Sequence, residues 1–446
     1  MIEAFFFIIL LIFLLILLIV LNFLFKFDWF EPSITITFAM FLSVFLAYVN
    51  MYRWVYNISF VTFLSISLGY ISFSLGSIYV FYILFYKTKQ KNFVYKYKTK
   101  FFDNNILLLI VSLIMLLLMY FSFKDVYNLS LSLGNKDSIS GMIKTVRYAL
   151  EQHQIYSLGR WMTYRLLIAQ TLAYTYIYMF FYKSFFDKFK IIDIKFLVPG
   201  ILFFPFMIFT TGRMELMKFF IFVTVIIAIL YKRKYGNFFN KNIKLNFLLI
   251  IFATIFISLF FAFGNFTGKV ITKNHSPFVI LSHYGGLSVP ALDVVLNQTF
   301  IEDKYIGQNT LVNVYRVIEK FGVTLPKVEY FLPFVHFEGI DTNVYTALGR
   351  YIKDFGYLGM MVIMFMLAII YTFFYHKSIN EKGHIITLLY ATLSFPLFLS
   401  SIDERFLLDI FGMPLVYDIV LFYVADKFII RQYIKQKINH KVIETI

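Results

Sequence analysis

Uninterrupted apolar runs of about eighteen residues or more recur from one end of the chain to the other. Each run is long enough to cross the hydrocarbon core of a bilayer, roughly 30 Å thick, as an α-helix. Lipid offers the backbone no hydrogen bonds, so such runs predict helices that span a membrane. With 60% hydrophobic and 15% charged residues in 446 positions, little chain is left for a soluble domain. The expected fold class is an all-α polytopic membrane protein.

The hydropathy pattern predicts eleven spans. They are expected at residues 2–25, 33–50, 60–86, 106–123, 164–182, 196–211, 216–231, 245–266, 357–375, 385–402 and 411–426. The first run carries Glu3 in place of a basic amino-terminal region and lacks a small-residue cleavage site, so we expect a retained span and not a signal peptide.

Lysine clusters orient these spans. Residues 87–100, 183–195, 232–244 and the tail after Asp426 are rich in lysine, and alternation of the spans puts them all on one side. By the positive-inside rule that side is cytoplasmic, with the amino terminus outside and the carboxyl terminus inside. The expected organisation is residues 1–266 with eight spans and a short external amphipathic segment (124–163), 267–356 as a large external loop, and 357–446 with the last three spans and a basic tail.

Composition excludes several kinds of chemistry. The chain has no cysteine, which removes disulfides, thiolate nucleophiles, cysteine-ligated zinc and iron–sulfur clusters. The net charge of +16 reflects lysine in cytoplasmic loops, so nucleic acid is not an expected partner. No HExxH motif or cluster of acidic residues is present, and we expect neither a metal site nor a cofactor.

Arginine is distributed differently from lysine. The residues on the predicted outer side are Arg53, Arg147, Arg160, Arg165, Arg213, Arg316, Arg350 and Arg405, whereas only Arg233 and Arg431 lie inside. Orientation needs positive charge alone, but a planar guanidinium is required to grip phosphate or carboxylate with two hydrogen bonds. The bias predicts an external site for an anion such as phosphate or pyrophosphate. The alternative is that each arginine extends toward lipid headgroups at the end of a span.

Helices are expected in both external segments. Met142, Val146 and Leu150 share one helical face, which predicts an amphipathic helix; we interpret it as a membrane-surface anchor with an Arg147–Glu151 pair. A second helix is predicted within residues 309–322. A third is expected from residue 342 into the span at 357, with Asp341 as its cap. On that helix Arg350 and Asp354 are spaced to pair at i, i+4.

Four segments, in this order, resemble the bacterial oligosaccharide repeat-unit polymerases of the Wzy family. They are TTGRMEL (210–216), HYGGLSVPALD (283–293), GQNTLVNVYRVIEKFG (307–322) and DTNVYTALGRYIKDFGYLG (341–359). The resemblance implies a GT-C-like membrane glycosyltransferase in the bacterial cytoplasmic (inner) membrane, with its active site on the periplasmic face. It would polymerise undecaprenyl-pyrophosphate-linked oligosaccharides into O-antigen or capsule without a metal, with membrane lipids around it and a chain-length regulator as a further partner.

Candidate residues follow from the arginine bias and the resemblance together. For the pyrophosphate leaving group they are Arg213, Arg350, Arg405, Arg316 and Arg165. For proton transfer they are His336, Glu338, Asp341, the rival His283 and, from the closing motif, Asp354. For sugar contacts they are Tyr284, Asn343 and Tyr345.

Two other functions stay open. An O-antigen ligase uses the same donor with a different acceptor and would show a similar arginine cluster. A flippase or transporter of lipid-linked sugars would show internal repeats and charges at mid-membrane, neither of which is evident here.

Overall fold

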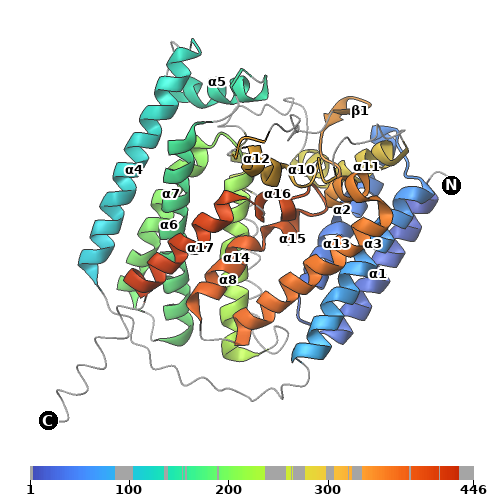
Figure 1. Cartoon of the computed structure of the whole chain (residues 1–446), viewed down its shortest axis with the longest axis horizontal. Helices are drawn as coiled ribbons and strands as arrows, with labels where there is room; N and C mark the ends of the chain where they lie inside the picture. The colour runs from blue at the N-terminus through green and yellow to red at the C-terminus, as the bar shows by residue number, and fades with distance from the viewer. Residues whose placement is uncertain are drawn as a thin grey trace. The chain divides into compact units, whose positions relative to one another are not determined.

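The computed structural model describes residues 4–85, 104–134, 139–152, 154–155, 158–187, 190–236, 258–262, 264, 277–297, 306–319, 321–323, 334–380, 383–410 and 412–430. Within them the regular secondary structure is helical apart from one short hairpin (Figure 1). It divides into two compact units: unit 1 comprises residues 1–93, 274–380 and 393–415, and unit 2 comprises residues 94–273, 381–392 and 416–446.

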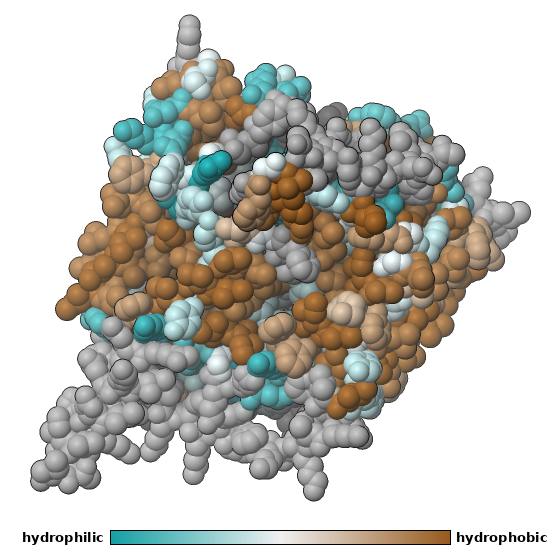
Figure 2. Space-filling view, in the orientation of Figure 1, coloured by the Kyte–Doolittle hydropathy of each residue, from teal (hydrophilic) through white to brown (hydrophobic). Residues whose placement is uncertain are grey.

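Eight helices of the described part are long and apolar enough to cross a membrane. They are Phe5–Leu24, Pro32–Trp54, Phe60–Ile83, Asn105–Ser132, Ile191–Phe209, Met214–Tyr235, Phe278–Asn297 and Thr346–Asn380. Large apolar side chains stay exposed on them, for example Ile12 and Ile16 on the first and Leu113 on the fourth, as lipid-facing positions require. Figure 2 shows apolar side chains over most of the visible helix surface and hydrophilic ones mainly near the helix ends.

Seven of these eight helices coincide with predicted spans, and the other predictions have different outcomes. Residues 164–182 lie in a helix, Arg160–Phe186, that is too rich in tyrosine to meet the same criterion. Residues 385–402 form two helices with a break at Ser394, and 411–426 form a helix of 13 residues, Met413–Ala425. The 245–266 span lies mostly outside the described residues. Phe278–Asn297, which was expected in the external loop, meets the length and composition of a span.

Unit 1 is built around α3 (Phe60–Val80) and α13 (Thr346–Asn380), which pack against each other. A kink at Gly356, whose φ of 67° is not helical, divides α13 into two parts. The two helices approach closely at Gly76, where a Cβ would lie 2.5 Å from the carbonyl oxygen of Phe365. Beside them lie α1 (Phe5–Leu24) and α2 (Pro32–Trp54), and α3 continues into a π-helical turn, η2 (Phe81–Phe85). A glycine at this contact lets two helix backbones approach closely in a medium where the hydrophobic effect cannot drive helices together.

The remaining elements of unit 1 gather near the carboxyl end of α2 and the amino ends of α3 and α13. They are α10 (Pro277–Gly286), α11 (Ser288–Asn297), α12 (Val312–Glu319), the hairpin β1 (Val335–Phe337) with β2 (Ile340–Thr342), α15 (Phe395–Leu399) and α16 (Phe406–Ile410). Gly286 of α10 contacts the backbone of α2, with its hypothetical Cβ 2.8 Å from the nitrogen of Ala47. Asp341, expected to cap α13, lies in β2 instead, and α13 begins at Thr346.

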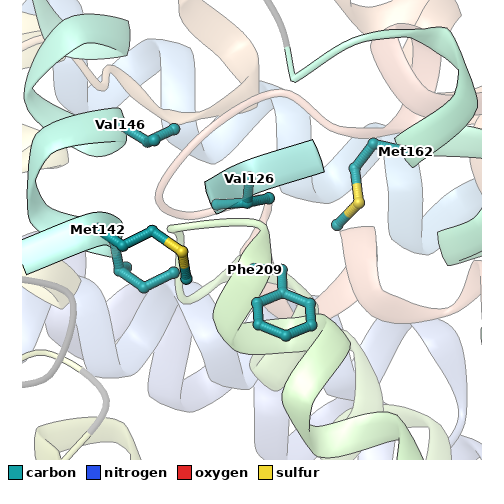
Figure 3. Packing of buried hydrophobic residues seen from close by; sticks show 6 residues of the cluster. Val126, Met142, Val146, Met162 and Phe209 are labelled. Carbon is teal, nitrogen blue, oxygen red and sulfur yellow. The ribbon is translucent and has the colours of Figure 1, made fainter. Parts of the chain in front are cut away.

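Unit 2 contains α4 (Asn105–Ser132), α5 (Ile139–Glu151), α6 (Arg160–Phe186), η3 (Ile191–Leu197), α7 (Val198–Phe209), α8 (Met214–Tyr235), α14 (His384–Leu393), α17 (Met413–Ala425) and η4 (Asp426–Ile430). Burial confirms that Met142 and Val146 share the apolar face of α5. That face packs on Val126 of α4, Met162 of α6 and Phe209 of α7 (Figure 3). The interpretation of α5 as a membrane-surface anchor was therefore wrong, because its apolar face is covered by protein.

Candidate functional site

Two arginines that are distant in the sequence share one carboxylate in unit 1. The carboxylate of Asp403 lies 2.8 Å from Nη2 of Arg405 and 3.9 Å from Nε of Arg350. Arg350 is only 4% exposed, and its Nη1 donates a hydrogen bond of 2.8 Å to the carbonyl oxygen of Asn309. Both arginines were predicted to bind pyrophosphate, and the fold brings them to the same place. We call Arg350, Asp403 and Arg405 the arginine pair with its bridging aspartate.

The start of α13 is closed by the segment that carries Asp403. The N–H of Thr346 donates to the carbonyl oxygen of Ile402 at 3.1 Å, and the N–H of Ala347 donates to that of Ser400 at 2.8 Å. These bonds satisfy backbone donors that a helix start otherwise leaves free. The Thr346 hydroxyl oxygen, one turn before Arg350, is buried and has no hydrogen-bond partner within the described part of the chain. Thr346 precedes Arg350 by one helical turn, so its hydroxyl group lies near one of the two arginines.

Asp354 holds the turn that precedes α12. Its carboxylate accepts hydrogen bonds from the backbone N–H of Asn309 at 3.1 Å, the Asn309 side-chain amide at 2.7 Å and the Thr310 N–H at 2.7 Å. The Thr310 hydroxyl donates to it as well. The expected i, i+4 pairing with Arg350 is replaced by these contacts. Because its carboxylate oxygens accept these hydrogen bonds, the role of Asp354 in the fold is to hold this turn. The geometry gives no support to its predicted part in proton transfer.

Glu404 fixes the start of α16. It is fully buried and accepts hydrogen bonds from the Tyr351 hydroxyl at 2.8 Å and from the N–H groups of Leu407 at 2.7 Å and Leu408 at 3.0 Å. Burial raises the pKa of Glu404 to about 7, against the lowering effect of these donors. Because Tyr351 follows Arg350 and Glu404 precedes Arg405, this contact ties the two arginine-bearing segments together.

The hairpin carries three of the predicted proton-transfer residues. His336 and Asp341 face each other in the register of β1 and β2, and Nδ1 of His336 lies 2.7 Å from Oδ1 of Asp341. Their side chains are 75% and 55% exposed, so the imidazole is accessible to a substrate. Glu338 is exposed in the turn between the strands. A carboxylate that orients a histidine ring is the arrangement a general base requires.

The other unit 1 candidates are spread over neighbouring elements. His283 and Tyr284 lie in α10, and the ring centroids of His283 and Trp54 are 6.1 Å apart. Tyr345 is buried against Ala291 and Val335, and this burial raises its pKa to about 12. Its ring packs in the protein, which leaves it little surface for a sugar. Asn343 is half-buried between β2 and α13.

The remaining three arginine candidates have separate environments. Arg316 is exposed on α12 of unit 1. In unit 2, Arg165 donates from Nε to the Ser122 hydroxyl at 3.1 Å and forms an ion pair with Asp125, which explains its charge structurally. Arg213, also in unit 2, is 8% exposed and its guanidinium lies 4.6 Å from the ring centroid of Phe260.

Sequence reasoning missed several residues that organise these sites. Asp403 lies two residues before Arg405 in the sequence, but its contact with Arg350 depends on the fold. Asp293 accepts bonds from the Tyr56 hydroxyl at 2.9 Å, the Ser59 N–H at 2.7 Å and the Thr62 hydroxyl at 2.7 Å, which joins α11 to the start of α3. The sequence marked Asp293 only as the last residue of the HYGGLSVPALD segment and as an aspartate within an apolar stretch.

Among the residues that the structure describes, no group of three histidine, aspartate or glutamate side chains could hold a metal ion. No protein family, curated protein or solved structure matches the chain. The function proposed below is therefore argued from the residues of this chain and their geometry.

Proposed function

We propose that this protein is a membrane glycosyltransferase that polymerises undecaprenyl-pyrophosphate-linked repeat units into a surface polysaccharide, in the manner of the family that its motifs resemble. In this reaction the acceptor hydroxyl oxygen attacks the anomeric carbon of the donor. The bond from that carbon to the pyrophosphate oxygen breaks, and the lipid pyrophosphate leaves. A chain-length regulator is a proposed partner.

The observation that carries the proposal is the arginine pair with its bridging aspartate. Two guanidinium groups share one carboxylate, so a site built from these three side chains retains a net positive charge for an incoming anion. Low exposure strengthens the attraction, because a charge interacts more strongly in a medium of low dielectric constant. Arg350 and Arg405 would stabilise the charge that develops on the leaving pyrophosphate, and the Thr346 hydroxyl is a further donor beside Arg350.

We assign to His336 the removal of the proton from the acceptor hydroxyl group. Its pairing with Asp341 orients the ring, and its exposure leaves the other ring nitrogen accessible. In the proposed step Nε2 takes the proton from the acceptor hydroxyl as the new glycosidic bond forms. Asp341 would stabilise the resulting imidazolium.

The test is polymerisation of the native lipid-linked repeat unit by purified protein in the absence of metal. The lipid A core, which is the acceptor that a ligase would use, is also left out. We compare wild type with Arg350→Lys and Arg405→Lys, which keep the charge but lose the planar fork. Arg53→Lys is the matched control, since Arg53 is an exposed arginine in the last turn of α2. We expect a ladder of polymer lengths from wild type and Arg53→Lys, and a rate at least about tenfold lower for the other two.

Each outcome separates the candidates. A normal rate in both Arg350→Lys and Arg405→Lys would remove the arginine pair from the mechanism. If wild type produces no ladder but transfers glycan to a lipid A core acceptor, the protein is a ligase. If it catalyses neither reaction but moves the lipid-linked unit across liposomes, it is a transporter.

A further inference from the structure

The DFGYLG part of the closing motif (354–359) lies at the kink of α13. Gly356 has φ 67° and ψ −176° there, whereas a helical residue would have φ of about −63° and ψ of about −42°. This backbone conformation is open in practice only to glycine, because a Cβ would clash with the neighbouring backbone. The break in the helix therefore depends on Gly356.

The kink separates two parts of α13 that have different partners. The first part, residues 346–355, carries Arg350, and its hydrogen bonds go to the segments around the proposed pyrophosphate site: Arg350 donates to the Asn309 carbonyl oxygen, and the Tyr351 hydroxyl donates to Glu404. The second part, residues 357–380, packs on α3, which it approaches closely at Gly76. The direction that the chain takes at Gly356 thus decides where Arg350 lies relative to the span.

Phe355 and Gly359 complete the kink. A Cβ on Gly359 would overlap Cβ of Phe355, so position 359 has no room for a side chain. The Phe355 ring extends to the turn before α12, where its Cζ lies 3.3 Å from the position of a Cβ on Gly307. That turn also holds Asn309, whose carbonyl oxygen accepts from Arg350. The two glycines of DFGYLG therefore have separate tasks: Gly356 makes the kink, and Gly359 leaves space for the side chain that fastens it.

A small change at the kink has a large effect on Arg350. Arg350 lies six residues before Gly356, which is about 9 Å along an α-helix. A change in direction of about 20° at Gly356 would therefore move Arg350 by about 3 Å. A group that stabilises a transition state tolerates far less, since a displacement of about 1 Å can lower a rate about a hundredfold.

We propose that Phe355, Gly356 and Gly359 are positioning residues, and that the kink they form directs Arg350 toward the leaving pyrophosphate. This role rests on the function proposed for Arg350. It gives a physical reason for the DFGYLG segment, in which Asp354 and Phe355 fasten the turn before α12 and the glycines set the direction of the helix.

The test is a double-mutant cycle, measured as steady-state polymerisation by the purified full chain. The variants are Gly356→Ala, Arg350→Lys and the two combined. Gly134→Ala is the matched control: Gly134 also has a positive φ, of 86°, with no atom within 4 Å of a Cβ, but it follows α4 in unit 2. Phe355→Ala is a milder variant, which removes the ring from Gly307 and adds no backbone strain. The unfolding temperature of each variant checks the fold.

We expect Gly356→Ala to lower kcat at least about tenfold and to leave KM close to that of wild type, because the lost contact forms only in the transition state. In the Arg350→Lys background the same change should have little further effect, since lysine lacks the planar fork that the kink directs. A general structural role would give the same fold-loss in both backgrounds. Phe355→Ala should show the same dependence on Arg350 with a smaller loss, and Gly134→Ala should retain the wild-type kcat.

Three results would overturn the positioning role while the function of Arg350 stands. They are equal losses in the two backgrounds, a wild-type kcat in both Gly356→Ala and Phe355→Ala, and a loss of the same size in Gly134→Ala. If Gly356→Ala does not fold, the cycle with Phe355→Ala decides. A wild-type rate in Arg350→Lys alone, or no polymer from wild type, would instead remove the proposed function, and the positioning role with it.

Discussion

Replacing Asp354 with asparagine distinguishes a structural from a chemical role for this residue. The carboxylate accepts from two backbone N–H groups, one amide and one hydroxyl in the Asn309–Thr310 turn. Asparagine keeps one acceptor oxygen and turns an NH2 group toward the other donors, so about two hydrogen bonds to a charged acceptor are lost. At about 1.5–3 kcal/mol each, less relaxation of the turn, the expected cost is about 3 kcal/mol.

This cost should appear first as local opening, since the turn before α12 can detach without unfolding the spans. Hydrogen–deuterium exchange of the peptide covering residues 306–319 is the appropriate assay. A change of about 3 kcal/mol corresponds to exchange roughly a hundredfold faster. Asp341→Asn is the matched control: its carboxylate is 55% exposed and pairs only at the surface, where an ion pair contributes about 1 kcal/mol or less.

The reasoning is refuted by a specific pattern. If Asp354→Asn exchanges at the wild-type rate in residues 306–319 and yet abolishes polymerisation, then Asp354 takes part in the chemistry and the sequence-based assignment was right. If exchange accelerates and polymerisation falls only moderately, the residue holds the turn whose Asn309 carbonyl contacts Arg350.

Three further predictions concern stability in detergent, measured as the unfolding temperature. Gly76→Ala places a Cβ 2.5 Å from the Phe365 carbonyl oxygen and should lower the free energy of unfolding by about 1–3 kcal/mol. Gly212→Ala is the control and should lower it far less, because the nearest atoms to its Cβ are 3.9 Å away. Equal changes in unfolding temperature for the two variants would disprove the close contact. Asp293→Ala leaves the Ser59 N–H without its acceptor and should lower the free energy of unfolding by at least about 2 kcal/mol. An unchanged unfolding temperature would show that the contact between Asp293 and the start of α3 does not stabilise the fold. Glu404 has a folded pKa of about 7, above its ordinary value near 4.5, so its contribution is fully present below about pH 4.5 and is lost as pH rises through 7. Wild type should therefore unfold at a higher temperature at pH 5 than at pH 8, and Glu404→Gln should make the difference between these two temperatures smaller. If the unfolding temperature of the variant differs from that of wild type by the same amount at both pH values, this reasoning is wrong.

Prediction from the sequence succeeded where a local pattern determines the outcome. The 3.6-residue spacing of Met142 and Val146 identified the buried face of α5. It could not say what covers that face, since protein and lipid headgroups are equally compatible with an amphipathic helix. The cap assigned to Asp341 failed for a related reason: a two-stranded hairpin competes for residues 340–342, and its pairing is not local enough to be evident in a helix pattern.

The candidate site shows the same division. Arg350 and Arg405 were selected individually from the outward bias of arginine, but nothing in the sequence indicated that one aspartate would contact both. Asp354 has the spacing of a helical ion pair with Arg350, and the fold instead directs its carboxylate to the turn at Asn309. A spacing rule compares positions on one helix, whereas the stronger set of donors came from another segment of the chain.

The sequence by itself determined that this protein is embedded in a membrane. The length and hydropathy of an apolar run can be read from the sequence alone, and a bilayer requires helices of that length. Orientation stays a prediction, which follows from lysine placement because that placement is a property of single loops. Only the tertiary structure decided which charged groups meet. Arg350 reaches Asp403, Ser59 reaches Asp293 and Thr310 reaches Asp354 from segments far away in the chain. Such contacts depend on packing that no local pattern encodes.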